Sequence, residues 1–161
     1  MQIRFADARP TGDFALVLPA AGNLRPGVDG LGAAKAGIEA ALKRSRFEGE
    51  AGSVVEYFLD GDGGRRLLVI GAGAEAAKGD APEKLGGTAV SRLLTSGETH
   101  AVIDLGDLKF DVDAAARVAL AAALRGWRYD RYRPRLKDKQ KPTLATVTIV
   151  GASAEAEQRY A

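Results

Sequence analysis

The chain has 161 residues, with 23 lysines and arginines against 21 aspartates and glutamates, one histidine and no cysteine. That length fits one compact domain with its own core. The lack of cysteine excludes disulfides, cysteine-ligated metal centres and a thiolate nucleophile, and a single histidine excludes any site that needs two imidazoles. No apolar run reaches the roughly 20 residues that span a bilayer. The N-terminus also lacks a signal-peptide layout, so we expect a cytoplasmic protein.

Basic residues are concentrated in one segment. The net charge is only +2, yet the sequence pI is about 9.0. Residues 125–141 hold eight basic and two acidic side chains, a local net charge of +6, so the rest of the chain carries −4. We interpret this segment as an interaction surface or a solvated connector. The basic side chains of this candidate surface are Arg125, Arg128, Arg131, Arg133, Arg135, Lys137, Lys139 and Lys141.

The N-terminal part predicts two strands, a helix and a second pair of strands. The alternation in QIRFAD predicts a short strand, and the apolar run at 14–20 predicts a more buried one. Residues 31–42 follow the helical period. Two β-rich runs at 53–59 and 65–71 are separated by DGDGG, which predicts a hairpin or a tight connection.

A second helix is predicted to start at Asp80. We expect Asp80 to be its N-cap, with Pro82 in the first turn and Glu83 completing a capping box. Gly86 and Gly87 each cost roughly 1 kcal/mol relative to alanine inside a helix, so we interpret them as permitting close packing of this helix on a sheet. The expected buried face consists of Leu85, Ala89, Val90 and Leu93.

The remaining elements are a strand at 101–105, a helix capped by Asp111 or Asp113, and a strand at 144–150. The helix has an apolar stripe made of Val112, Ala116, Leu120, Leu124 and Trp127. The final residues, AEAEQRYA, predict the first turns of another helix. Because strands and helices alternate from Gly52 onward, the sequence predicts an α/β domain with a largely parallel sheet.

One motif suggests nucleotide binding. Residues 71–76 (GAGAEA) follow a strand and match the dinucleotide-binding pattern G-x-G-x-x-A. The helical period resumes only after Asp80, however, and no acidic residue ends a strand near Ser91, where the ribose would need one. A glycine-rich turn leaving a central strand is therefore the favoured interpretation.

Other candidate sites fail on residue type. Residues 60–64 (DGDGG) resemble the start of a calcium loop, but Gly64 occupies the fifth position, where a ligand is required. His100 stands alone at the start of a strand, and no Ser–His–Asp set can be assembled around it. The sequence therefore predicts no catalytic, cofactor-binding or metal-binding residue in this chain.

Several segments together resemble a known family. In chain order they are 45–50 (SRFEGE), 66–73 (RLLVIGAG), the glycine pair at 86–87, 126–133 (GWRYDRYR) and 141–144 (KPTL). This order is similar to the N-terminal domain of the cytosolic leucyl aminopeptidases, which are two-metal exopeptidases. The most specific element is WRYDRY, and the resemblance covers nearly the whole chain.

The resemblance implies a three-layer, macrodomain-like α/β/α sandwich over 1–151, with a mostly parallel or mixed sheet. Residues 152–161 would begin a linker helix to a larger C-terminal catalytic domain. In that family the metal ligands and the catalytic lysine and arginine lie in the C-terminal domain, around motifs such as NTDAEGR. This chain contains no such motif, so no catalytic residue is carried over. The two divalent metals, zinc or manganese, are expected in the catalytic domain.

The implied function is a non-catalytic domain that supports oligomer assembly and access to the active site of a metalloaminopeptidase. Its expected partners are the catalytic domain and the other subunits of a homo-hexamer, with no membrane. Two alternatives stay open. One is an ADP-ribose or nucleotide-binding module, suggested by the macrodomain-like sheet and the 71–73 turn. The other is a nucleic-acid-binding module that uses 125–141, where aromatic residues are interleaved with the cations.

Overall fold

Six strands form a single sheet with helices on both of its faces. The computed structural model describes residues 1–21, 26–29, 31–59, 63–73, 79–106, 108, 110–127 and 141–161. The strands are β1 (Gln2–Ala6), β2 (Ala15–Ala20), β3 (Val54–Leu59), β4 (Arg65–Gly71), β5 (His100–Asp104) and β6 (Thr146–Val150). The helices are α1 (Pro26–Asp29), α2 (Lys35–Arg44), α3 (Ala81–Leu93), α4 (Val112–Gly126) and α5 (Ala154–Tyr160), with a 3₁₀ turn, η1, at Gly32–Ala34.

The sheet is mixed and mostly parallel. Its strand order is β1-β6-β5-β2-β4-β3, and every neighbouring pair is parallel except β3 and β4. The antiparallel pair confirms the predicted tight connection, beside which Gly63 and Gly64 both have positive φ. The parallel pairs need crossovers, which the helices supply. The α/β class and the largely parallel sheet predicted from the sequence are confirmed.

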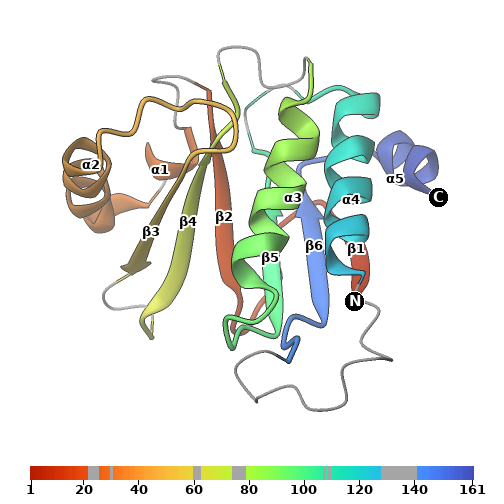
Figure 1. Cartoon of the computed structure of the whole chain (residues 1–161), viewed down its shortest axis with the longest axis horizontal. Helices are drawn as coiled ribbons and strands as arrows, with labels where there is room; N and C mark the ends of the chain where they lie inside the picture. The colour runs from red at the N-terminus through yellow and green to blue at the C-terminus, as the bar shows by residue number, and fades with distance from the viewer. Residues whose placement is uncertain are drawn as a thin grey trace.

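Two apolar clusters fill the space between the sheet and its helices. In β2, Ala15 and Val17 face one cluster while Leu16 and Leu18 face the other, as the period of two in a strand requires. The first cluster lies under α3, α4 and α5, and the second lies under α1 and α2. Figure 1 shows α3 and α4 side by side in front of the sheet and α2 beside β3. The molecule is therefore a three-layer α/β/α sandwich.

Close contact between α3 and α4 depends on one of the two glycines. A Cβ at Gly86 would overlap the carbonyl oxygen of Val118 and lie 3.1 Å from the amide nitrogen of Ala122, so α4 backbone occupies that space. A Cβ at Gly87 would meet nothing within 4 Å. The predicted packing of these glycines on the sheet is wrong, because Gly86 permits a close approach to the helix α4 and Gly87 faces open space.

The two predicted helix caps differ in outcome. Asp80 precedes α3 but its side chain makes no capping hydrogen bond, so the predicted capping box is wrong. Glu83 instead accepts hydrogen bonds from Arg117 of α4, one of them 2.8 Å long. Asp111 does cap α4, since its Oδ1 accepts from the amide of Ala114 at 2.7 Å.

The apolar stripe of α4 is mostly exposed. Leu120, Leu124 and Trp127 keep 49%, 66% and 71% of their surface accessible to solvent. The buried face of α4 consists of Ala114, Ala115, Ala116, Val118, Ala119 and Ala122. Small side chains face α3 because the helices approach too closely at Gly86 for larger ones. The larger residues therefore lie outside, and the helix packs through a different face from the one that its stripe suggests.

The last helix, α5, packs on α4 and on the first strand. Ser153 caps it by accepting from the amide of Ala156, whose side chain is fully buried. The Tyr160 ring lies against Phe5, with ring centroids 5.7 Å apart. The helix predicted in the final residues is confirmed, and Figure 1 shows it beside α4.

Candidate functional site

Only two of the eight basic residues predicted as an interaction surface fall within the described residues. Arg125, in the last turn of α4, donates a hydrogen bond to Ser91 Oγ at 3.2 Å. Lys141 is exposed and precedes β6. The other six lie in 128–140, outside the described residues, so the structure does not test this surface.

In the described part of the glycine-rich turn, residues 71–73, each amide already donates to a carbonyl oxygen of the protein. The amide of Gly71 donates to Ser53 O at 2.8 Å, that of Ala72 to Ala20 O at 2.7 Å, and that of Gly73 to Gly49 O at 2.9 Å. The next described helix, α3, begins only at Ala81. A dinucleotide site needs free amides at a helix N-terminus, so the contacts of 71–73 support the interpretation as a structural turn, while residues 74–76 of the motif lie outside the described residues.

The described residues contain no group of three or more histidine, aspartate or glutamate side chains placed to hold a metal. Residues 60–62 of the rejected calcium loop lie outside them. His100 begins β5, where its Nε2 lies 2.8 Å from Thr148 Oγ1. Burial, and secondarily the charge of Arg4, lowers the pKa of His100. His100 is thus a half-buried residue whose contact with Thr148 links β5 to β6.

The main unassigned surface is the exposed apolar side of α4, here called the α4 stripe and defined as Leu120, Leu124 and Trp127. Among the described residues, the other large exposed hydrophobic side chains are those of Met1 and Phe58. Met1 lies against the same helix, because a Cβ on Gly126 would be 2.8 Å from its Sδ. Apolar residues gathered in this way mark a contact surface more often than the same residues scattered singly do.

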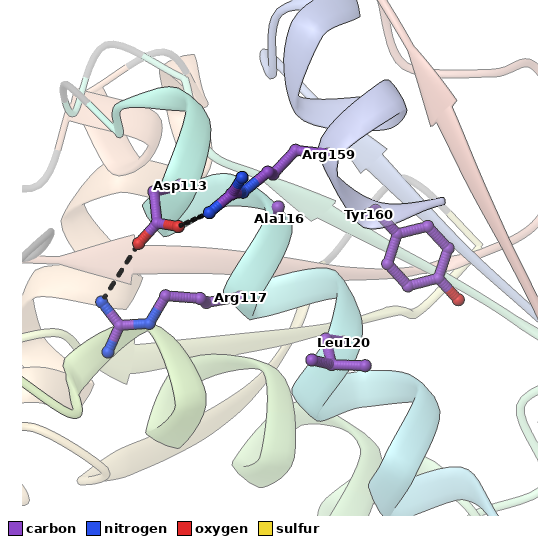
Figure 2. A pocket seen from close by; sticks show the side chains of 6 residues that line it. All are labelled: Asp113, Ala116, Arg117, Leu120, Arg159 and Tyr160. Carbon is purple, nitrogen blue, oxygen red and sulfur yellow. Dashed lines mark ion pairs between the residues drawn. The ribbon is translucent and has the colours of Figure 1, made fainter.

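A hollow of about 160 Å³ lies between α4 and α5 beside the stripe. Figure 2 shows its lining, which is Asp113, Ala116, Arg117 and Leu120 from α4 and Arg159 and Tyr160 from α5. Pockets for small organic ligands usually measure about 300 Å³ or more. The hollow is therefore better suited to a single protein side chain than to a metabolite.

The polar rim of the hollow is an ion-pair network. Asp113 lies 3.8 Å from Arg117 Nη1 and 3.7 Å from Arg159 Nη2 (Figure 2). Arg117 also donates to Glu83 and to the carbonyl oxygen of Gly79. The hydrogen bond to Glu83 is the main cause that raises the pKa of Arg117, so its charge is constant at any physiological pH. The rim of the hollow thus consists of paired charged side chains, and its floor is apolar.

The sequence contained a signal for this exposed surface, but helical periodicity alone predicts that the same residues form the buried face of the helix. The hollow residues Asp113, Arg117, Arg159 and Tyr160 were not predicted as a site. The signal is an alanine-rich helix whose few large apolar residues share one side, since a close helix crossing buries alanine in preference. A larger hollow, of about 320 Å³, lies between Arg9, Arg65 and Leu31, but Arg65 is already bonded to the carbonyls of Phe14 and Gly12.

No helix among the described residues is both long enough and apolar enough to cross a bilayer.

Comparison with known proteins identifies the family. The model of the "Cytosol aminopeptidase family, N-terminal domain" matches residues 22–135. A probable cytosol aminopeptidase of Afipia carboxidovorans is 30% identical over 125 residues, which is 76% of this chain and 25% of the relative. One from Rhodopseudomonas palustris is 35% identical over 125 residues, 74% of this chain and 24% of the relative. The chain thus spans about a quarter of the length of these curated relatives.

A solved structure agrees with this fold. A mutant of tomato leucine aminopeptidase aligns with a TM-score of 0.71 and 19% identity, over 99% of this chain and 34% of the tomato chain. At that identity the likeness concerns the fold alone. The family-model match includes the segment that contains WRYDRY, the element on which the resemblance mainly depended. The chain belongs to the cytosol aminopeptidase family and corresponds to its N-terminal domain.

Proposed function

We propose that this chain is the non-catalytic N-terminal domain of a leucyl aminopeptidase, a metal-dependent enzyme that removes N-terminal amino acids from peptides. The observation that carries the proposal is the match of residues 22–135 to the family's N-terminal domain. The described residues supply no ligand set that fits a two-metal centre. In this proposal two divalent metals, zinc or manganese, and the residues that use them belong to a catalytic domain outside this chain.

The proposal also gives the domain a supporting role in the oligomer. It would contribute to assembly of a cytoplasmic homo-hexamer and shape access to the active site. Residues 1–151 would form the domain and 152–161 the start of the linker helix. The names of the relatives support a cytosolic location. The packing of α5 on α4 supports the linker, because it anchors that helix to the domain. The macrodomain-like character of the sheet stays a prediction.

A peptidase assay tests the central statement. The purified 161-residue chain, supplied with manganese or zinc, is expected to release no p-nitroaniline from leucine p-nitroanilide. The full-length Afipia carboxidovorans relative, assayed in the same buffer, serves as the positive control. Metal-dependent turnover by the pure chain that persists through two further purification steps would contradict the proposal.

No observation favours the two alternative functions. Nucleotide binding at the 71–73 turn lacks donors, since all three amides are bonded to protein carbonyls. Nucleic-acid binding through 125–141 depends mainly on residues outside the described ones, so it stays a prediction from charge alone.

A further inference from the structure

A pocket on the side of the sheet that carries α1 and α2 has the size and the lining of a small-ligand site. It measures about 320 Å³, and such sites usually measure about 300 Å³ or more. Its walls are the 9–12 segment between β1 and β2, the starts of β2 and β4, the end of β3, and Leu31. We propose that this pocket, here called the Arg9 pocket, binds a small organic carboxylate with a short apolar tail, such as that of leucine.

The floor of the Arg9 pocket is apolar. Phe14, Leu16 and Leu59 border it although they are only 6%, 2% and 5% exposed. All three belong to the cluster under α1 and α2, and the half-buried Leu31 packs against the same cluster. An alkyl chain placed here would leave water and contact side chains of the core, which is what favours the binding of an apolar group.

Arg9 supplies the charged contact for a carboxylate. Its Nε donates a hydrogen bond to Asp104 Oδ2 at 2.7 Å, and no other described residue accepts a hydrogen bond from its guanidinium group. The contact with Asp104 therefore orients the guanidinium and leaves Nη1 and Nη2 available. A guanidinium group binds a carboxylate through two parallel hydrogen bonds. The Arg9 side chain is 36% exposed, so a solute can reach it.

The charges around the pocket favour an anion over a cation. The charged side chains among its described lining residues are those of Arg9 and Arg65, and no carboxylate is among them. Asp104 offsets part of the charge of Arg9, but it does not line the pocket. A purely cationic ligand would meet two guanidinium groups, whereas a carboxylate meets the donors of Arg9.

Arg65 forms a fixed wall of the Arg9 pocket. Its guanidinium donates to the carbonyl oxygen of Phe14 at 2.8 Å and to that of Gly12 at 3.1 Å. Its Cζ also lies 4.0 Å from the centroid of the Phe14 ring. These contacts hold the 12–14 segment against the start of β4, so the pocket is formed before a ligand arrives. The proposal does not require Arg65 to exchange these partners, and a preformed site costs less to occupy.

This inference goes beyond the proposed function and does not depend on it. A carboxylate beside an apolar side chain occurs in free hydrophobic amino acids and at the C-termini of peptides. The Arg9 pocket recognises the chemistry that both share. The experiment below therefore includes one probe for each source.

An NMR titration of the amide signals of the 161-residue chain with 4-methylpentanoate tests the binding. The signals of Gly12, Phe14 and Leu31 should shift, with a Kd on the order of 1 mM. Leucinamide has the tail without a carboxylate, and acetate has the carboxylate without the tail. Each should bind at least about tenfold more weakly. Leucine and N-acetylglycylleucine are titrated in the same way, and the tighter of the two identifies the source.

Two variants locate the ligand. Arg9→Gln should weaken the binding of 4-methylpentanoate at least about tenfold, because glutamine lacks the charged fork. Arg92→Gln, at an exposed arginine of α3 on the other side of the sheet, should leave the affinity unchanged. Since Arg9→Gln also removes the ion pair with Asp104, Leu31→Trp serves as a second variant, which fills the pocket and keeps Arg9. It should likewise weaken binding, and the amide spectra show that each variant is folded.

The proposal is overturned if no signal shifts at about 20 mM 4-methylpentanoate, or if leucinamide binds with equal affinity. Unchanged affinity in Arg9→Gln or in Leu31→Trp would place the ligand outside the Arg9 pocket and would also overturn it. A peptidase-active chain would contradict only the proposed function, because the titration does not measure hydrolysis.

Discussion

Gly86 and Gly87 are adjacent in α3 but have opposite surroundings. We expect Gly86→Ala to lower the free energy of unfolding by about 1–3 kcal/mol, because its methyl group would enter space held by α4 backbone, which cannot rotate away. Gly87→Ala should raise it by about 0.5–1 kcal/mol, since the site is open and alanine favours the helix. Urea denaturation curves of the two variants measure both effects.

The two glycines serve as controls for each other, because they share one helix and one chemical change. Equal effects in the two variants would contradict the close approach of α3 and α4 at Gly86. The sequence predicted a packing role for both. It could not separate them, because the difference depends on where the backbone of Val118 lies, and that position follows from the crossing of two helices distant in sequence.

The amides of Gly71, Ala72 and Gly73 make a related point about motifs. Glycine at position 71 lets the 49–53 segment approach, since a Cβ there would overlap the carbonyl oxygen of Glu50. A phosphate-binding loop needs glycine for the same steric reason but leaves its amides free. The glycine pattern therefore indicates that another group comes close to this backbone, but it does not show whether that group is a protein segment or a phosphate. In the sequence, the two possibilities were distinguished by the delayed start of the following helix and by the lack of an acidic residue at a strand end near Ser91.

At the scale of the helix, Asp111 and Asp80 have the same chemistry at equivalent positions but different contacts. We expect Asp111→Ala to lower the free energy of unfolding by about 1 kcal/mol, because the amide of Ala114 loses its acceptor. Asp80→Ala should change it by less than about 0.5 kcal/mol, since its side chain makes no capping bond and forms only an exposed ion pair with Lys84. Thermal or urea unfolding of both variants provides the comparison.

A large loss at Asp80, or none at Asp111, would contradict these cap assignments. The sequence proposed a capping box at Asp80 from spacing alone. Glu83, which the box requires, is bonded instead to Arg117, a residue 34 positions away. Glu83 therefore forms a charged hydrogen bond to another helix instead of completing the capping box. The spacing of residues within one helix contains no information about such a distant partner.

The face of α4 shows the same limit for a whole element. Existence and extent of the helix were predictable from its alanines, its cap and its period. The buried face was not predictable. Seven alanines are distributed around the helix, so Leu120, Leu124 and Trp127 form its strongest apolar pattern. In the structure, small side chains of α4 are buried and its largest ones are exposed, because α3 comes close to α4 at Gly86. Where two helices meet at a glycine, the larger apolar residues mark the outer face.

At the scale of the molecule, the alternation of strands and helices predicted the sheet because it reflects right-handed crossovers between parallel strands. The strand order was less accessible. β1 pairs with β6, at opposite ends of the chain, and this pair then joins β5. The β1 edge of the sheet and the position of α5, whose Tyr160 ring lies against Phe5 of β1, depend on that pairing. Periodicity within each strand carries no signal for it.

The stability of the whole chain is expected to depend on pH, and near neutrality the main contribution comes from His100. His100 is the only histidine, and its pKa is lowered from 6.5 by burial first and by the charge of Arg4 second. The folded protein thus binds this proton more weakly than the unfolded chain. Stability from the neutral imidazole is fully present above pH 6.5 and is lost as the pH falls through the folded pKa.

We therefore expect the urea midpoint to fall between about pH 7.5 and 5.5, and to fall less in His100→Gln. Glutamine cannot titrate in this window yet can still bond to Thr148 Oγ1, which lies 2.8 Å from His100 Nε2. Carboxylates titrate mostly near pH 4, so they add little slope here. Equal slopes in the two proteins would show that the imidazole is as easily protonated in the fold as in the open chain. The conclusion that burial between β5 and β6 lowers the pKa of His100 would then be wrong.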